Sequence, residues 1–392
     1  MTHVDVAVIG TGPGGGMAAC RLARTGLRVL LLEKETLPRA KPCGGAMPAD
    51  VRQLLDWDFS AVIDAQPRLV RSLYNHAAPK ELQSATPILM VNRSRFDHHL
   101  VERAVSLGTG SVHLREAFTV EVVEEDADGV SIRHTDGEHV RADYLIAADG
   151  AFSTTAQRLG LKRRTMMGAA IDVEVEVAPD VYEAEAPYAT FNFNCVPGGY
   201  GWIFPKDGYL ACGVGSWRRK ARLQQGMRDF LDRSFPPGSI RSVQRAGHPI
   251  PLFTGHQPIA TRRVCLVGDA AGLVDPVMGE GIRMALKSGA LAADVIAALL
   301  GADTGHDADI SAHAVEEPDC RAYQALIRQG IGRDLDMLYR LILPIFVKAP
   351  EFFFRTFYGE GRSYYLLSQQ LAARLNTSGA QGVPARADED AA

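Results

Sequence analysis

Glycine and acidic residues near the start of this chain have a spacing that can hold a dinucleotide. The apolar run 4–9 leads directly into Gly10-Thr11-Gly12-Pro13-Gly14-Gly15, and Glu33 ends the next apolar run, 28–32. Gly10 allows a tight turn, Gly12 lets the backbone approach a pyrophosphate, and Gly15 lets a helix pack close to the strand. A carboxylate at Glu33 can accept hydrogen bonds from ribose hydroxyls. The alternative interpretation is a glycine turn before an ordinary helix.

Two later segments indicate which dinucleotide is bound. Asp269 follows the apolar strand expected at 264–267, where its carboxylate can accept hydrogen bonds from ribityl hydroxyls. Gly281 and Ile282 begin an expected helix over 282–300, whose N-terminal amides can face the pyrimidine edge of a flavin. Asp149-Gly150 ends a further apolar run and predicts a turn beneath the cofactor, although this dipeptide is common. Together the segments favour FAD over a nicotinamide dinucleotide.

Strands and helices must alternate to position these residues. We expect strands at 28–32 and 144–148, a first helix over 16–25, and an α/β fold with a Rossmann-like FAD-binding domain. This discontinuous domain is predicted at 1–165 and 255–300. Residues 166–254 are rich in expected strands and predict a substrate domain with a mainly antiparallel sheet, which would cover the isoalloxazine face. A C-terminal helical region is expected at 301–377, and a disordered tail at 378–392.

Two further motifs identify a family. Lys41-Pro42-Cys43-Gly44-Gly45 follows the second expected strand, and Tyr200-Gly201-Trp202-Ile203-Phe204-Pro205-Lys206 matches the pattern Y-x-W-x-F-P. With the glycine segments, these motifs resemble the geranylgeranyl reductase family. That family belongs to the flavoprotein superfamily with the p-hydroxybenzoate hydroxylase type of fold. The resemblance is specific from residue 2 to about residue 295, and it is loose beyond.

The resemblance implies a set of FAD contacts. Arg93 lies in Arg93-Ser94-Arg95-Phe96-Asp97, which fits the R-x-x-F-D stretch of the family, and Ala117 would contribute backbone to the adenine pocket. The implied cofactor-binding residues are Gly12, Gly15, Glu33, Lys34, Cys43, Gly44, Arg93, Ala117, Asp269, Gly281 and Ile282.

The resemblance also implies a reaction, in which reduced flavin saturates carbon–carbon double bonds of geranylgeranyl-type chains. An isolated alkene has no neighbouring carbonyl, so a proton must reach one carbon while hydride reaches the other. The expected catalytic residues are Cys43, Tyr200, Trp202 and Phe204. The aromatic residues would form a wall that holds the double bond against the flavin, and Cys43 would donate the proton or shape the position of the alkene. The alternatives are strand core for the aromatic residues and a merely small residue for Cys43.

Composition excludes several other classes of protein. The chain has 392 residues, a net charge of −4 and 22% charged residues, which gives no indication of nucleic-acid binding. Its six cysteines form no C-x-x-C pair and no metal-ligand spacing with histidine, so we expect a cytoplasmic location and no metal. Because no second Rossmann fingerprint is present, electrons would come from transient NADPH or from a reduced ferredoxin acting as a partner protein.

The region after residue 337 is apolar and aromatic, with interspersed cations, and has two interpretations. Leu341, Phe346, Phe352, Phe353 and Phe357 either pack in the core or form a surface that dips into the inner face of the cell membrane, where an isoprenoid lipid substrate would be found. Two other functions also suit the fold. They are an FAD-dependent monooxygenase or halogenase acting on an aromatic or lipid substrate, and a flavin electron carrier that docks on a membrane quinone partner.

Overall fold

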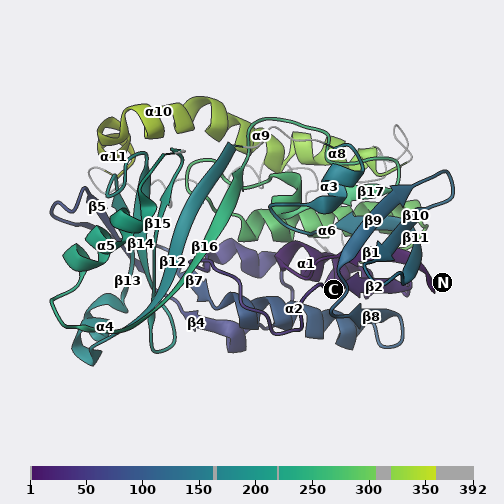
Figure 1. The fold of residues 1–392 in the computed structure, drawn as a ribbon, viewed down its shortest axis with the longest axis horizontal. Helices are drawn as coiled ribbons and strands as arrows, with labels where there is room; N and C mark the ends of the chain where they lie inside the picture. Colours follow the sequence, from purple (N-terminus) through teal and green to yellow (C-terminus); the bar gives the residue numbers. More distant parts are fainter. Residues whose placement is uncertain (1, 162–165, 219, 306–318, 359–392) are drawn as a thin grey trace, which may run out of the picture.

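The fold was analysed in a computed structural model that describes residues 2–161, 166–218, 220–305 and 319–358 (Figure 1). The tail predicted at 378–392 and the end of the predicted helical region lie outside these residues. Two large sheets form the framework, with helices between them and along one side (Figure 1). The predicted α/β class is confirmed.

The first sheet has seven strands in the order β8-β2-β1-β11-β10-β9, and β17 pairs with β11. Strands β2 and β17 and the carboxyl-terminal halves of β1 and β11 are apolar because both faces of the sheet are covered there, as parallel sheets require. Their carboxyl ends meet at one edge, and the glycine segments of the sequence follow there. The strands are β1 (Thr2–Ile9), β2 (Val29–Leu32), β8 (Val112–Arg115), β9 (Val120–Glu125), β10 (Val130–His134), β11 (His139–Ala147) and β17 (Val264–Leu266).

Helices α1 (Pro13–Leu22) and α6 (Ile282–Leu299) pack closely because glycines meet at their crossing. A Cβ at Gly289 would lie 2.1 Å from the carbonyl oxygen of Gly14. α1 begins three residues before its predicted start at residue 16, because Pro13 is favourable in the first turn of a helix. Helices α2 (Arg93–Leu107), α3 (Thr154–Arg158) and α8 (Arg321–Gln329) complete this part of the fold.

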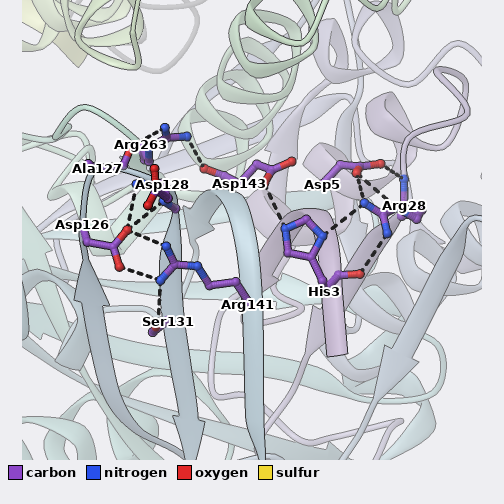
Figure 2. A network of polar contacts seen from close by, with 11 residues as sticks. His3, Asp5, Arg28, Asp126, Ala127, Asp128, Ser131, Arg141, Asp143 and Arg263 are labelled. Carbon is purple, nitrogen blue, oxygen red and sulfur yellow. Dashed lines mark hydrogen bonds and ion pairs between the residues drawn. The ribbon is translucent and has the colours of Figure 1, made fainter. Parts of the chain in front are cut away.

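Polar contacts tie strands of the first sheet together at the end remote from the glycine segments (Figure 2). His3 Nε2 lies 3.1 Å from Asp143 Oδ1, which joins β1 to β11. Arg141 of β11 donates to Asp126 Oδ2 at 2.7 Å and to Ser131 Oγ at 2.8 Å. Because these side chains are exposed or only half-buried, each contact contributes little to stability.

The second sheet has the order β16-β12-β15-β14-β13-β5-β6 and is antiparallel except for the pair β13–β5. Two of its strands, β5 and β6, come from the first chain segment, so this sheet extends beyond the predicted boundaries 166–254. β16 was not foreseen, nor were helices α4 (Pro179–Glu185) and α5 (Leu223–Ser234). The strands are β5 (Leu69–Tyr74), β6 (Lys80–Gln83), β12 (Met166–Val177), β13 (Tyr188–Phe193), β14 (Gly199–Pro205), β15 (Leu210–Ser216) and β16 (Ile240–Leu252).

A small sheet and the C-terminal helices complete the described fold. The small sheet consists of β3 (Ala46–Pro48), β7 (Ile88–Val91) and β4 (Ile63–Ala65), and short 3-10 turns occupy 49–53, 60–62 and 268–271. Helices follow at α9 (Ile331–Met337), η4 (Leu338–Ile342), α10 (Leu343–Lys348) and α11 (Pro350–Tyr358). The last of these helices lie along the second sheet (Figure 1). Helices were expected from residue 301 onwards, and the described part of that region contains them.

Candidate functional site

One cavity of about 710 Å³ lies between the two large sheets. Its walls include the loops at the carboxyl ends of the first sheet and one face of the second sheet. Most of the sequence-predicted site residues line it, namely Gly12, Glu33, Lys34, Cys43, Gly44, Arg93, Tyr200, Trp202, Phe204, Asp269, Gly281 and Ile282. The fold therefore brings together residues from six separate parts of the chain.

The glycine loop presents backbone amides to the cavity. Gly12 is the N-cap of α1 and provides no side-chain cap, so amides of the first turn remain available for an anion. Gly15 lies behind this loop, where a Cβ would be 1.9 Å from the carbonyl oxygen of Gly10. Gly10 itself has a φ of 92°, which favours glycine. Gly15 is thus required for close packing, whereas Gly12 borders the cavity.

Glu33 is held in place by the same loop. Its Oε2 accepts hydrogen bonds from Thr11 N at 3.0 Å and from Thr11 Oγ1 at 2.5 Å. Burial raises the pKa of this carboxyl, but Thr11 and the Arg39 guanidinium outweigh burial and hold the pKa below its ordinary value. Glu33 is therefore ionised and can accept hydrogen bonds from a ribose. The neighbouring Lys34 lines the cavity, and its side chain is 70% exposed.

Two arginines converge on the glycine loop. Arg93 donates to both oxygens of Asp97 at 2.8 Å, and Arg39 Nη2 lies 3.4 Å from Asp97 Oδ2. A Cβ at Gly12 would lie 3.7 Å from Nη2 of Arg39 and 3.9 Å from Nη2 of Arg93. Sequence reasoning identified Arg93 through its motif but missed Arg39, which lies in a loop without a recognisable pattern. The two guanidinium groups and the amides of α1 together suit a pyrophosphate.

The start of α6 forms the opposite end of the cofactor-binding surface. Gly281 is the N-cap of α6 without a side-chain cap, and a Cβ there would lie 3.3 Å from Asp269 Oδ1. His248 of β16 lies with Nε2 3.9 Å from Asp269 Oδ2 and also lines the cavity. Sequence reasoning missed His248 because β16 itself was not foreseen.

Ala117 does not line the cavity, although the sequence predicted it as a contact. The following residues Phe118, Thr119 and Val120 do so. Ala117 has a φ of 53°, and its carbonyl oxygen lies 3.1 Å from His134 Nε2. Its role in this structure is to turn the chain so that its neighbours reach the cavity.

The aromatic wall is built on β14. Tyr200, Trp202 and Phe204 alternate along the strand, so their side chains share one face. Trp202 lies across Gly213 of β15, where a Cβ would be only 1.9 Å from Cζ2 of the indole. The Tyr200 hydroxyl donates to the carbonyl oxygen of Met278.

The cysteine loop lies against this wall. A Cβ at Gly44 would be 2.9 Å from Trp202 Nε1 and 3.0 Å from Phe204 Cδ2. The four predicted catalytic residues, Cys43, Tyr200, Trp202 and Phe204, are thus brought to one side of the cavity.

The aromatic residues of the C-terminal helices are largely core. Phe346, Phe353, Phe354 and Tyr358 are buried in one cluster with the wall residues. Leu341 and Phe352 differ, because they are 61% and 59% exposed. None of the helices in the described part of the chain combines the length and apolar character needed to cross a bilayer.

Two further ionisable residues belong to this region, and sequence reasoning missed the first of them, Asp172. Asp172 of β12 lines the cavity, and burial raises its pKa to about 7. Lys206 is 1% exposed, donates from Nζ to the carbonyl oxygen of Val91 at 2.8 Å, and has a pKa that burial lowers to about 8. No group of three or more His, Cys, Asp or Glu side chains that could hold a metal ion occurs within the described ranges.

The chain is similar in sequence to a known family model and to curated reductases. Residues 3–310 match the family model described as FAD binding domain. The chain is 31% identical to geranylgeranyl diphosphate reductase of Synechocystis sp., over 75% of each chain. It is 32% identical to digeranylgeranylglycerophospholipid reductase of Thermoplasma volcanium, over 75% of this chain and 78% of that protein.

Solved structures agree with these relatives. A geranylgeranyl bacteriochlorophyll reductase-like protein of Thermoplasma acidophilum has a TM-score of 0.72 and 25% identity, over 95% of this chain and 96% of that one. A flavin-dependent brominase and a probable FAD-dependent monooxygenase share the fold at 21% and 18% identity. The predicted fold type is therefore confirmed.

Proposed function

Because the chain belongs to the geranylgeranyl reductase family of FAD-dependent oxidoreductases, we propose that it saturates carbon–carbon double bonds of geranylgeranyl-type isoprenoid chains. The relatives are named for a diphosphate and for a glycerophospholipid that carry such chains. We extend to this chain the part that both names share, the geranylgeranyl group, and leave the head group to experiment.

The continuous cavity is the observation that carries this proposal. Its first part has uncapped helix N-termini, Glu33 and two arginines, which suit a charged dinucleotide. Its second part is lined by Phe191, Tyr200, Trp202 and Phe204, which suit an apolar chain. Since both parts open into one space, a flat cofactor ring and an alkene can meet there.

The residues present fit FAD. Gly12 and Arg93 would hold the pyrophosphate, Glu33 the adenosine ribose, and Asp269 with the N-terminus of α6 the ribityl chain and flavin ring. A Cβ at Gly281 would lie 3.3 Å from the Asp269 carboxylate, so a side chain there would displace this carboxylate slightly. When bound and reduced, FAD supplies the hydride. We propose that the electrons come from transient NADPH or a reduced ferredoxin, because the chain has a single dinucleotide fingerprint.

The protein's own residues orient the alkene and exclude water. Trp202 and Phe204 are 7% and 6% exposed, and the Gly44 loop limits their movement. Such buried, rigid side chains hold a flat substrate at low entropic cost. The exposed Leu341 and Phe352 are proposed to rest on the membrane surface from which the lipid is taken.

The test is anaerobic single turnover. The purified protein with FAD is reduced by dithionite and mixed with geranylgeranyl diphosphate or with a digeranylgeranyl glycerophospholipid. We expect oxidation of the flavin together with a product two hydrogens heavier, and the faster substrate identifies the preferred head group. A Trp202→Ala variant serves as a control that retains the FAD contacts but loses the wall.

Two results would contradict the proposal. One is reduced flavin that is unaffected by either lipid. The other is a hydroxylated or halogenated product formed after oxygen is admitted, with no alkene reduction, which would place the chain among oxygen-using flavoproteins.

A further inference from the structure

A half-buried carboxyl group, with one oxygen fully buried, lies beside the aromatic wall. Asp172 of β12 is in register with Gly213 of β15, and Gly213 is in register with Trp202 of β14. Because glycine has no side chain, nothing on β15 separates the carboxyl group from the indole. Asp172 and Trp202 also line the same cavity as the Cys43 loop. The carboxyl group thus lies on the wall against which the alkene is proposed to bind.

The carboxyl group of Asp172 interacts with the Trp202 indole and with the backbone at Cys43, but one of its oxygens forms no well-aligned hydrogen bond. Oδ1 of Asp172 and Nε1 of Trp202 are both buried without a well-aligned hydrogen bond among the described residues. A buried polar atom without a well-aligned hydrogen bond is costly, and such atoms are frequent at sites of chemistry. An ionised carboxylate would increase this cost, whereas a protonated carboxyl group reduces it.

We propose that Asp172 donates the proton to the alkene carbon that does not receive hydride. This inference rests on the proposed function. In the reaction the O–H bond of Asp172 breaks and one C–H bond forms, while the hydride from reduced flavin forms the second C–H bond and the π bond is lost. The flavin is oxidised by two electrons, the alkene is reduced, and Asp172 is left as a carboxylate. A proton taken up from the solvent then restores the acid, so that each reduction consumes one hydride and one solvent proton.

The charged groups around Asp172 suit this cycle. Burial raises the pKa of Asp172 to about 7, and the charge of Glu174 acts in the same direction. Lys206, the backbone at Cys43 and the Trp202 indole act in the opposite direction and stabilise the carboxylate that remains after transfer. A general acid is most effective when its pKa lies near the working pH.

The other candidate donors have hydrogen-bond partners of their own, and only Tyr200 has its single proton committed to one. Cys43 Sγ accepts a hydrogen bond from Gly45 N at 3.3 Å and lies beside the Arg93 guanidinium, so its sulfur is turned toward donors. The Tyr200 hydroxyl donates to Met278, and Lys206 donates to Val91. Cys43 then serves better to position the loop, which is the second of the two roles expected from the sequence.

The decisive experiment compares Asp172→Asn with Glu176→Gln. Glu176 lies on the same strand, is exposed and does not line the cavity, so its variant controls for loss of a carboxylate. In Asp172→Asn with reduced FAD, we expect a loss of about 10²-fold or more in the single-turnover rate. Lipid affinity should change less than about threefold. Asp172→Glu should recover part of the rate.

A second readout does not depend on turnover. Infrared spectra of the wild-type holoenzyme should contain the carbonyl band of a protonated buried carboxyl group at pH 6, and this band should disappear on titration above pH 8. It should be missing in Asp172→Asn and retained in Glu176→Gln. The wild-type single-turnover rate should fall over the same pH range.

The outcomes separate this inference from the proposed function. If wild-type protein reduces no prenyl substrate, the proposed function fails, and the proton-donor role fails with it even where the band is present. If wild type is active but Asp172→Asn keeps more than half of its rate, only the proton-donor role fails. Absence of the titrating infrared carbonyl band in active wild-type protein also overturns the proton-donor role of Asp172.

Discussion

Gly213 is the residue that allows Trp202 to lie flat in the aromatic wall. A methyl group at Gly213 would lie 1.9 Å from Cζ2 of the indole, whereas one at the neighbouring Gly215 would have its nearest contact at 3.4 Å, with Trp217. We therefore expect Gly213→Ala to displace the indole and to reduce the free energy of unfolding by about 1–3 kcal/mol, as overpacked cores do. Urea denaturation measures this change.

The matched control for this prediction is Gly215→Ala on the same strand. It should remain within about 0.5 kcal/mol of wild type, as substitutions without such a clash usually do. Equal effects of the two variants would show that loss of glycine in β15, rather than contact with Trp202, determines stability. Prenyl reduction should slow in Gly213→Ala only.

Asp172 should also make stability depend on pH. Its pKa is raised from 3.8 in the unfolded chain to about 7 in the folded protein, chiefly by burial, with Glu174 adding to and Lys206 and Cys43 opposing the shift. Between pH 4 and pH 7 the unfolded chain releases this proton while the folded protein retains it. The stabilising contribution is therefore complete below about pH 4, is lost as the pH rises to about 7, and is constant above.

Comparison of wild type with Asp172→Asn isolates this contribution. The variant should gain stability relative to wild type as the pH rises from 4 to 7, by an amount on the order of a few kcal/mol, since one pKa unit corresponds to about 1.4 kcal/mol. Denaturant titrations at pH 4, 5.5, 7 and 8 measure it. A difference that does not vary with pH would mean that Asp172 titrates normally.

The sequence indicated Asp172 poorly for a physical reason. Asp172, Glu174 and Glu176 alternate with apolar residues, which is the pattern of a strand with one solvent-facing side. In the structure Glu174 and Glu176 are indeed exposed, but the same face enters the cavity at Asp172. Alternation predicts on which face of the strand a residue lies. Whether that face is exposed to solvent depends on the position of the other sheet, which alternation does not give.

Helices α1 and α6 present the amides that would bind the cofactor. The distance between the two helices depends on glycine residues at their crossing. A Cβ at Gly289 would meet the backbone of Gly14 at 2.1 Å, and backbone cannot move aside as a flexible side chain can. Gly289→Ala should force the helices apart and cost roughly 3 kcal/mol of stability, at the upper end for overpacking. FAD affinity, measured by flavin fluorescence, should fall because both helix N-termini move.

Gly247→Ala provides the comparison for this prediction. Its nearest contact would be 3.6 Å, which is ordinary packing, and residue 247 is exposed. This variant should retain the stability and FAD affinity of wild type. If Gly289→Ala behaved in the same way, the close crossing of α1 and α6 would not be needed for binding.

Elements with local signals were predicted well, and those without them were not. The turn at Gly10–Gly15, the acid at Glu33 and the start of α6 follow from neighbouring residues in the sequence. The pairing of β13 with β5 joins residues 119 positions apart, such as Tyr188 and Leu69, and no local pattern encodes it. His248 was missed for the same reason, because β16 pairs with β12 and His248 lies opposite Ala170, 78 positions earlier. Arg39 was missed because its loop has no recognisable pattern.

The whole molecule is organised around a cavity shared by its two sheets. The nucleotide half of this cavity belongs to the first sheet and the aromatic half to the second, so a bound FAD would contact both. A ligand that binds only the folded state stabilises it by about 2.7 kcal/mol at a hundred times its dissociation constant. We therefore expect FAD to stabilise the two sheets together and not the first sheet alone.

A Trp57→Phe variant makes this expectation measurable, because its remaining tryptophans, Trp202 and Trp217, both lie by the cavity in the second-sheet cluster. Added to the apo-protein, FAD should raise the midpoint of thermal unfolding by about 5 °C, both in tryptophan fluorescence and in circular dichroism. The second signal reports on all strands and helices. A shift in circular dichroism without one in tryptophan fluorescence would mean that FAD is held by the first sheet alone. In that case the aromatic wall would form independently of the cofactor, and the two sheets that form the cavity would unfold independently of each other.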